Sequence, residues 1–259
     1  MEARRGSNTW TPAELSSVEA RLAGRPAEYL LAWAVGAFAP DLCLASSFGP
    51  QSIVLMHMLS AIDPKTTVFY LDTDLLFPET YDLRDRLSAR FGMTITRVPA
   101  SLTLEQQAAS YGPDLWSREP NLCCHLRKVL PLRRFLASRP AWITGIRASQ
   151  TAQRARAARI EWDDANDLVK LNPLLDWPTE RVWSYIHSHD LPFNRLHLAG
   201  FPSVGCRPCT RAVRPGEDGR AGRWAGFAKT ECGIHGSGAP TGAGCLPLIT
   251  VNRAEEGVL

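Results

Sequence analysis

The fold of this chain is decided by the stretch LCLASSFGPQSIVLMHML at residues 42–59 and by VFYL at residues 68–71. Residues 42–46 are a short apolar run of the kind that forms a buried strand. Apolar side chains then recur at helical spacing over residues 51–59, and the second apolar run follows. A strand, a turn, a helix and another strand in this order predict parallel strands joined by a right-handed crossover.

The same alternation continues along the rest of the chain. Two helices are predicted within residues 11–38, where Thr11 precedes Pro12 as a helix cap does. Further strands and helices are predicted, with strands at 94–98 and 142–144 and helices at 78–91, 130–138 and 179–187. The expected fold class is therefore α/β, with a parallel sheet flanked by helices and a loop-rich C-terminal segment.

The length of 259 residues suits one generous domain. We expect a single domain over 1–235, made of the N-terminal helices at 11–38, an α/β core over about 40–200 and a cysteine-rich catalytic segment at 201–235. Glycine, proline and small residues dominate the stretch after that, so residues 236–259 are predicted to be a mobile C-terminal tail.

The composition is ordinary for a globular protein. Apolar residues make up 45% and charged residues 21%, which excludes collagen-like and wholly disordered chains. The formal net charge of +3 is too small to indicate a nucleic-acid partner. The N-terminus leads into no hydrophobic signal core, and no apolar run is long enough to span a membrane. We therefore expect a cytoplasmic protein.

Four of the seven cysteines form two pairs. Cys123 and Cys124 are adjacent, and Cys206 and Cys209 have the Cys-x-x-Cys spacing. Together they offer four thiolates, the number that a tetrahedral zinc ion or an iron–sulfur cluster needs. The alternatives are buried core cysteines or a thioredoxin-like redox pair, but a redox pair leaves the adjacent cysteines unexplained. A disulfide framework is not expected in a reducing compartment.

A further cysteine, Cys232, lies in a basic and glycine-rich context. His235 follows it closely, and cationic neighbours favour the nucleophilic thiolate form of a cysteine. The cations near it in sequence are Arg220, Arg223 and Lys229. Cys232 is therefore a candidate nucleophile, and the alternative is an incidental cysteine in a flexible segment. The other two cysteines have no such context, and we expect Cys43 in the core and Cys245 in the tail.

Three polar segments follow predicted strands, at residues 46–52, 71–74 and 144–147. In open α/β sheets the ligand crevice lies at the carboxyl ends of the strands. Gly49 allows a tight turn before a helix N-terminus that suits an anion, and Arg147 suits phosphate or sulfate. The alternatives are an ordinary strand–helix turn, a capped turn and a solvated basic loop. The first segment is neither a P-loop nor a dinucleotide-binding fingerprint.

The sequence from Glu231 to His235, Glu-Cys-Gly-Ile-His, is very similar to the Glu-Cys-Gly-Leu-His signature of the assimilatory sulfonucleotide reductases. Cys123-Cys124 together with Cys206-Arg207-Pro208-Cys209 resembles the cluster-binding pattern of the branch that uses adenylylsulfate (APS). The branch that uses 3′-phosphoadenylylsulfate (PAPS) usually lacks these cysteines. The resemblance extends from about residue 40 to residue 236 and includes the three loop segments in the family's order.

This resemblance implies a fold and a reaction. The fold would be the adenine-nucleotide α-hydrolase-like sheet. The reaction would be the thioredoxin-dependent reduction of APS to sulfite and AMP, through an enzyme S-sulfocysteine, in sulfate assimilation and cysteine biosynthesis. The partners would be APS and a separate thioredoxin or similar dithiol, with no nucleic acid and no membrane, and with a homo-oligomer left open. The same resemblance makes the chain an oxidoreductase acting on a sulfur group.

The resemblance also implies roles for individual residues. Cys232 and His235 would be catalytic, and Lys128 would lie between a [4Fe-4S] cluster and the substrate. The cluster ligands would be Cys123, Cys124, Cys206 and Cys209. Leu71 would contact the adenine through its backbone, and the other nucleotide or phosphosulfate contacts would be Ser47, Thr73, Arg147, Arg220, Arg223 and His235. Two departures from the family pattern lie beside this site, Asp74 in place of a usual glycine and Pro50-Gln51 in place of Ala-Glu.

Three other functions remain compatible with parts of the sequence. A PAPS-preferring reductase that keeps a cluster would need room and a basic partner for the 3′-phosphate. An ATP pyrophosphatase would carry a Ser-Gly-Gly-x-Asp-Ser loop, which residues 46–52 do not supply. A non-catalytic zinc-binding module would leave Cys232 idle.

Overall fold

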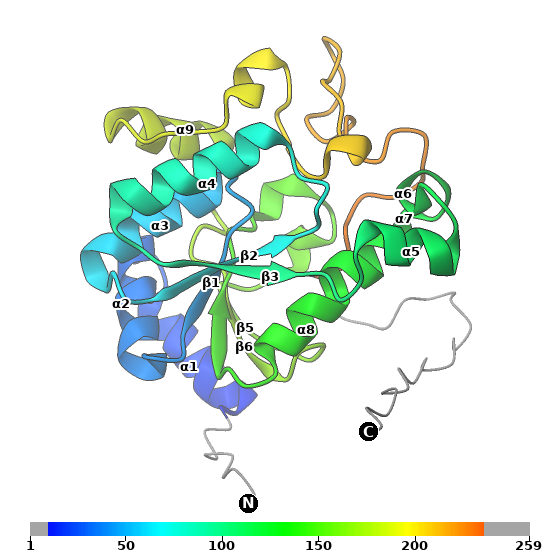
Figure 1. Cartoon of the computed structure of the whole chain (residues 1–259). Helices are drawn as coiled ribbons and strands as arrows, with labels where there is room; N and C mark the ends of the chain where they lie inside the picture. Colours follow the sequence, from blue (N-terminus) through cyan, green and yellow to red (C-terminus); the bar gives the residue numbers. More distant parts are fainter. Residues whose placement is uncertain (1–9, 236–259) are drawn as a thin grey trace, which may run out of the picture.

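The computed structural model describes residues 10–235, and Figure 1 shows their arrangement. A six-stranded sheet has the order β3-β2-β1-β4-β6-β5. Strands β1 to β4 and β6 run parallel, and β5 is antiparallel to β6 at the edge. The strands are β1 (Cys43–Ala45), β2 (Thr67–Asp72), β3 (Ile95–Pro99), β4 (Ala141–Ile143), β5 (Ile160–Asp163) and β6 (Leu168–Leu171). The expected α/β sheet is confirmed, apart from its antiparallel edge.

Helices cover both faces of the sheet, with α3 and α4 on one side and α8 on the other (Figure 1). The strands alternate accordingly, because successive side chains of a strand point to opposite faces. Leu44, Val68 and Ile143 join the larger core with α1 to α4 and α9, whereas Phe69 and Trp142 join the smaller core with α8. These helices are α1 (Pro12–Leu22), α2 (Ala27–Phe38), α3 (Pro50–Ile62), α4 (Pro78–Phe91), α8 (Leu130–Leu136) and α9 (Thr179–Ser188).

Two regions of regular structure were not predicted from the sequence. The first is a run of short helices between β3 and α8, comprising α5 (Leu104–Tyr111), α6 (Leu115–Arg118), α7 (Pro120–Cys124) and a π-helical segment (His125–Val129) that continues into α8. The second is the β5–β6 hairpin. Its tight turn is closed by Asp163, which accepts from Asn166, and by Asp167 in a left-handed conformation at φ 58°.

The C-terminal part of the described chain is built mainly of loops, as expected. It contains the 3₁₀ turns η4 (Arg195–Ala199) and η5 (Arg207–Cys209), and it runs back across the carboxyl ends of the strands. The expected tail at 236–259, with Cys245, lies outside the described residues. Within residues 10–235, no helix has both the length and the apolar run that a membrane span requires.

Helix α3 should contribute strongly to stability, because Leu55 is fully buried there. Leu55→Ala should lower the free energy of unfolding by about 2–5 kcal/mol, as lost apolar burial and a residual cavity both cost stability. Urea unfolding followed by tryptophan fluorescence measures this change. Leu198→Ala is the matched control, since that side chain is 77% exposed, and its unfolding midpoint should stay near the wild-type value. Equal effects of the two substitutions would contradict this packing.

Candidate active site

The three loops that follow β1, β2 and β4 meet at one cavity of about 450 Å³. This volume is within the range of about 300–1,000 Å³ typical of small-molecule sites. The C-terminal segment closes one side of the cavity. Most of the sequence-predicted site residues line it, namely Ser47, Leu71, Lys128, Arg147, Arg220, Arg223, Cys232 and His235. Thr73 does not; the structure places it in a neighbouring pocket.

The loop after β1 is held by its own serines. The buried Ser46 hydroxyl accepts from the Phe48 N–H at 3.1 Å and contacts the Ser52 hydroxyl at 3.2 Å. Gly49 caps α3 without a side chain that could bond to the free N–H groups of the first turn, and its carbonyl accepts from the Ser52 hydroxyl at 3.0 Å. The first N–H groups of this helix, which have no intrahelical partners, are therefore available to an anion in the cavity.

Gly145 allows the loop after β4 to pass close to the start of α3. A Cβ atom at Gly145 would lie 3.3 Å from the Ser52 backbone nitrogen and 3.1 Å from the Gln51 Cβ, which is tighter than ordinary contact. The close approach brings Arg147 to the wall of the cavity beside the α3 N-terminus. This close approach therefore requires a residue without a side chain at position 145.

Arg147 braces this wall as well as facing the cavity. Its guanidinium donates to the Trp177 carbonyl at 2.9 Å and to the Thr179 hydroxyl at 3.0 Å, and the side chain is buried. Burial lowers its pKa from the ordinary arginine value. Its Nε has no hydrogen-bond partner among the described residues, so one buried donor remains for a ligand.

The four paired cysteines line one small pocket beside the large cavity. Cys123 and Cys124 end α7, whereas Cys206 and Cys209 flank η5. All four are free thiols, and all but the half-buried Cys209 are buried. Burial, with the neighbouring cysteines, raises the pKa of Cys123 to about 12 and that of Cys209 to about 11.

The paired cysteines offer four thiols to one pocket. In a [4Fe-4S] cluster each iron takes one thiolate, so four thiols are the number that such a cluster needs. Within residues 10–235, no three His, Cys, Asp or Glu side chains are grouped closely enough for one metal ion.

Lys128 lines both the cysteine pocket and the large cavity. Burial disfavours its charge, but the nearby thiolates of Cys206, Cys124 and Cys232 more than offset this, so its pKa is raised. Burial likewise opposes ionisation of Cys206, yet Lys128 and the Thr73 hydroxyl together lower the pKa of that thiol. Lys128 is therefore a cation shared by the two compartments.

Cys232 reaches the cavity because the residue before it is anchored. The Glu231 carboxylate accepts from Arg154 Nε at 2.7 Å and Nη2 at 2.8 Å, and from the Thr151 hydroxyl at 2.9 Å. The side chains of Glu231 and Arg154 are 8% and 11% exposed. Gly233, at φ 91°, then turns the chain in the left-handed region that favours glycine.

This Glu231 anchor was not predicted as a site feature. The sequence identified Glu231 only as part of the C-terminal signature. Glu231 comes from the C-terminal segment, whereas Thr151 and Arg154 follow β4 some eighty residues earlier, so no local pattern connects them. The signal that could have found the pair is a lone acidic residue between basic residues and a candidate nucleophile.

His235 lies against Trp142 at the wall of the cavity. Its ring stacks on Trp142 with centroids 5.7 Å apart and an interplanar angle of 14°. Burial, reinforced by Arg154, Lys170 and Arg220, lowers its pKa well below the ordinary histidine value. Its Nδ1 is buried without a hydrogen-bond partner among the described residues. The ring can therefore bind a ligand through that nitrogen.

Comparisons with known proteins identify the family of this chain. Residues 41–212 match the phosphoadenosine phosphosulfate reductase domain. An adenosine 5′-phosphosulfate reductase of Salinibacter ruber is 47% identical over 89% of this chain and 92% of its own length. The chain belongs to the sulfonucleotide reductase family. As a member of this family, it is an oxidoreductase that acts on a sulfur group.

Other relatives are named after one or the other of two substrates, APS or PAPS. A protein of Bacillus velezensis named adenosine 5′-phosphosulfate reductase is 44% identical over 80% of this chain and 89% of its own length. A protein of Gloeobacter violaceus named phosphoadenosine 5′-phosphosulfate reductase is 48% identical over 80% of this chain and 88% of its own length. The crystal structure of a phosphoadenylyl-sulfate reductase from Candida auris matches with a TM-score of 0.69 and 27% identity, over 80% of this chain and all of that one. The expected fold is confirmed.

The Glu231 anchor makes a prediction about the exposure of Cys232. Glu231→Gln should speed alkylation of Cys232 by iodoacetamide by about tenfold or more, because charge-assisted hydrogen bonds contribute about 1.5–3 kcal/mol. The pKa of Glu231 is lowered, since its bonds to Arg154 outweigh burial, so the anchor is complete at neutral pH and is lost only as pH falls through that lowered pKa.

Peptide mapping after timed alkylation gives the rate at Cys232 alone. The matched control is Glu217→Gln, because Glu217 accepts from Arg211 in the same C-terminal segment without touching the loop after β4. An equal acceleration in both variants, or none in Glu231→Gln, would show that Glu231 does not hold Cys232 in place.

Proposed function

We propose that this chain is an assimilatory adenylylsulfate reductase, which reduces adenosine 5′-phosphosulfate to sulfite and AMP with electrons from thioredoxin. One observation carries the proposal: Cys232, Lys128 and the loops that follow β1 and β4 all line one cavity. Both loops are suited to binding a nucleotide. Each feature alone has an ordinary structural explanation. A thiol facing a nucleotide-sized cavity beside a cation and a cysteine pocket is what sulfur transfer from a nucleotide requires.

In the first step, the Cys232 thiolate attacks the sulfur of the substrate. The bond between sulfur and the bridging phosphate oxygen breaks, and AMP leaves with the electron pair. The enzyme keeps the SO3 group as an S-sulfocysteine. Lys128, Arg220 and Arg223 line the cavity near this reaction and would stabilise the charge that develops on the leaving phosphate. His235 would bind the substrate through its unpaired Nδ1.

In the second step, a dithiol reductant regenerates the enzyme. One thiolate of thioredoxin displaces sulfite, by attack on the Cys232 sulfur, and the second thiol resolves the mixed disulfide. Cys232 returns as a thiol and the reductant leaves as a disulfide, so two electrons pass to sulfur. Cys232 must therefore react first with the nucleotide and then with the reductant. The Glu231 anchor would hold Cys232 over the nucleotide during the first reaction and would have to open for the second.

Cys123, Cys124, Cys206 and Cys209 would hold a [4Fe-4S] cluster. When bound, the cluster supplies a fixed negative charge and a rigid link between α7 and the η5 loop. Lys128 would then lie between that charge and the anionic substrate. The role of Thr73 follows from its place in the cysteine pocket, where its hydroxyl lies 3.2 Å from Cys206 Sγ and would support that ligand.

The second candidate function is PAPS reduction by the same chemistry. It is favoured by the Gloeobacter violaceus relative, which bears that name. Other relatives at 41–47% identity are named adenosine 5′-phosphosulfate reductase, for example those of Salinibacter ruber and Bacillus velezensis, which favours APS. Initial rates of sulfite release from APS and from PAPS, compared at equal thioredoxin, decide between the two. We also propose a cytoplasmic location, because the six cysteines within residues 10–235 are all free, and free thiols and a thioredoxin partner suit a reducing compartment.

The nucleophile is tested by Cys232→Ser. The variant should lose sulfite production completely, because serine is hardly ionised at neutral pH and is a far weaker nucleophile. Its iron content and its calorimetric affinity for APS should stay close to wild type, since the metal ligands and most binding groups lie elsewhere. Sulfite production by the variant at a wild-type rate would exclude Cys232 as the nucleophile.

The cofactor is tested by iron analysis of anaerobically purified protein. The wild type should carry about four irons per chain, and Cys123→Ser should lose most of them because one of four ligands is removed. Cys43→Ala is the matched control, since Cys43 is a buried cysteine outside the pocket and its removal should leave the iron in place. Active wild-type protein with zinc and no iron would rule out the cluster.

A further inference from the structure

Asp74 adopts a backbone conformation that costs free energy. Its φ of 55° lies in the left-handed region, which glycine enters freely and which aspartate and asparagine enter more readily than other residues but still at a cost. It is the second residue after β2, between two residues that line the cysteine pocket. A glycine would fit this backbone without strain, so the side chain of the aspartate must contribute something that offsets the cost.

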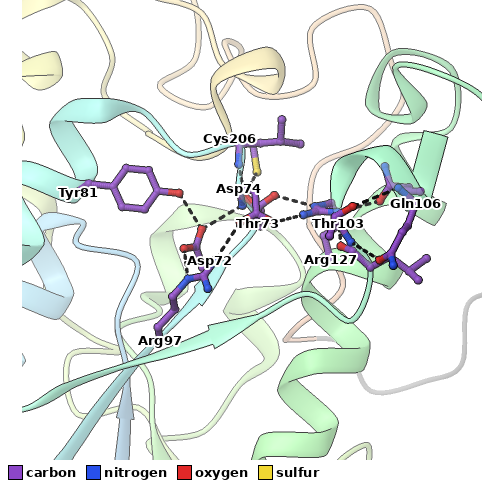
Figure 2. Close-up of polar contacts among 12 residues, drawn as sticks. Asp72, Thr73, Asp74, Tyr81, Arg97, Thr103, Gln106, Arg127 and Cys206 are labelled. Atoms are coloured by element: carbon purple, nitrogen blue, oxygen red, sulfur yellow. Dashed lines mark hydrogen bonds and ion pairs between the residues drawn. The ribbon is translucent and has the colours of Figure 1, made fainter. Parts of the chain in front are cut away.

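The Asp74 carboxylate pairs with a fully buried arginine, as Figure 2 shows. Its Oδ2 accepts from Arg127 Nη2, and the Arg127 side chain is only 1% exposed. Arg127 also donates through Nε to the Thr73 carbonyl at 2.7 Å. Its remaining partners are the Leu102 carbonyl and the Gln107 amide oxygen, which are uncharged. Asp74 is therefore the acidic partner that a buried guanidinium requires.

The position of Arg127 connects this ion pair to the first cysteine pair. Arg127 lies in the π-helical segment His125–Val129, which continues directly from α7. It is three residues after Cys124, so a guanidinium fixed at the end of β2 also fixes where α7 presents its two thiols. Without a carboxylate at residue 74, the buried charge would have no acidic partner among these contacts, and the helix could reduce the cost only by shifting.

The same short segment holds the second cysteine pair. Residues 73–76, which we call the β2 clip, follow β2 and touch the η5 loop at three points. The Thr73 hydroxyl lies 3.2 Å from Cys206 Sγ, the Leu75 carbonyl accepts from the Arg207 N–H at 2.7 Å, and Leu76 forms an antiparallel bridge with Cys206. The clip thus contacts both halves of the cysteine pocket, which are far apart in the sequence.

The other end of the clip is braced by the sheet. Arg97 on β3 donates to Asp74 at 2.9 Å and to Asp72 at 2.6 Å, and Tyr81 on α4 donates to Asp72 at 2.7 Å (Figure 2). The Asp72 carboxylate also accepts from the Asp74 N–H at 3.0 Å. The clip is consequently fixed to rigid elements, and the Arg127 ion pair transfers that rigidity to α7.

We propose that Asp74 is a positioning residue for the metal cluster: its carboxylate pins Arg127 to the β2 clip and so sets the placement of the Cys123-Cys124 pair relative to Cys206 and Cys209. This inference rests on the proposed function, because it takes the four cysteines to hold a [4Fe-4S] cluster. Asp74 touches neither the cluster ligands nor the nucleotide cavity. Its effect is exerted through Arg127 and the clip.

The test compares Asp74→Asn with wild type as iron-loaded, anaerobically purified protein. Asparagine tolerates the left-handed backbone and keeps the shape of the side chain, so the substitution removes mainly the charge. Transfer of iron to a coloured ferrous chelator should be about tenfold faster in the variant, because removing one partner of a buried ion pair is strongly destabilising. The visible circular dichroism of the bound cluster should also change, since it reports the arrangement of the four thiolates.

Asp85→Asn is the matched control, because Asp85 pairs with Arg84 on the exposed surface of α4 and its loss should alter neither reading. Asp74→Gly is the second variant, which relieves the strained backbone but also lacks the carboxylate. It should release iron as fast as Asp74→Asn. Wild-type behaviour of Asp74→Gly would show that the backbone alone matters and would overturn the proposal.

The failures of the two proposals are distinguishable. Wild-type protein without iron would overturn the proposed cofactor and this inference with it. Wild-type protein that holds iron and produces sulfite, together with an Asp74→Asn variant whose iron release and circular dichroism match it, would overturn only the role of Asp74.

Discussion

The structure depends on one constraint, which is that two cysteine pairs from distant parts of the sequence must meet in one small pocket. Helix α7 carries Cys123 and Cys124, and the η5 loop carries Cys206 and Cys209. Neither segment belongs to the sheet; the η5 loop contacts the segment that follows β2 directly, and α7 is linked to it through Arg127. The parallel sheet matters here because it ends β1, β2 and β4 at one edge, where the nucleotide cavity and the cysteine pocket adjoin.

Charge is the second organising feature of the site. An anionic substrate and a set of thiolates would repel each other unless cations separate them. Lys128 lines both compartments, and Arg220 and Arg223 line the cavity on the side of the C-terminal segment. Arg154 also lines the cavity, yet its guanidinium is bound to Glu231. The same basic surface would therefore serve the ligand and, through Glu231, hold the segment that carries the proposed nucleophile.

The parts that were predictable from sequence are those whose signal is local. Strands β1, β2 and β4 are short apolar runs, and α3 and α4 have helical spacing and a proline at their first turn. The cysteine pairs could be identified because adjacent cysteines and the Cys-x-x-Cys spacing are typical of only a few functions, mainly metal binding and thiol redox chemistry. The β5–β6 hairpin was missed because Glu161 and Lys170, which pair within it at 2.8 Å, interrupt its apolar pattern. Helix α5 was missed despite a capping signal, with Thr103 and Gln106 bonding reciprocally. Thr73 and Cys206 are separated by 133 residues in the sequence, so no local pattern reveals that they lie side by side.

The central claim is that Cys232 carries the sulfur between two partners, and the most direct measurement is the mass of its peptide. Wild-type protein is mixed with adenosine 5′-phosphosulfate in the absence of any reductant, digested and mapped by mass spectrometry. The account predicts that the peptide containing Cys232 gains the mass of one SO3 group, and that thioredoxin then removes this mass and releases sulfite. An adduct on another cysteine, or AMP accumulating with no adduct at all, would contradict the account.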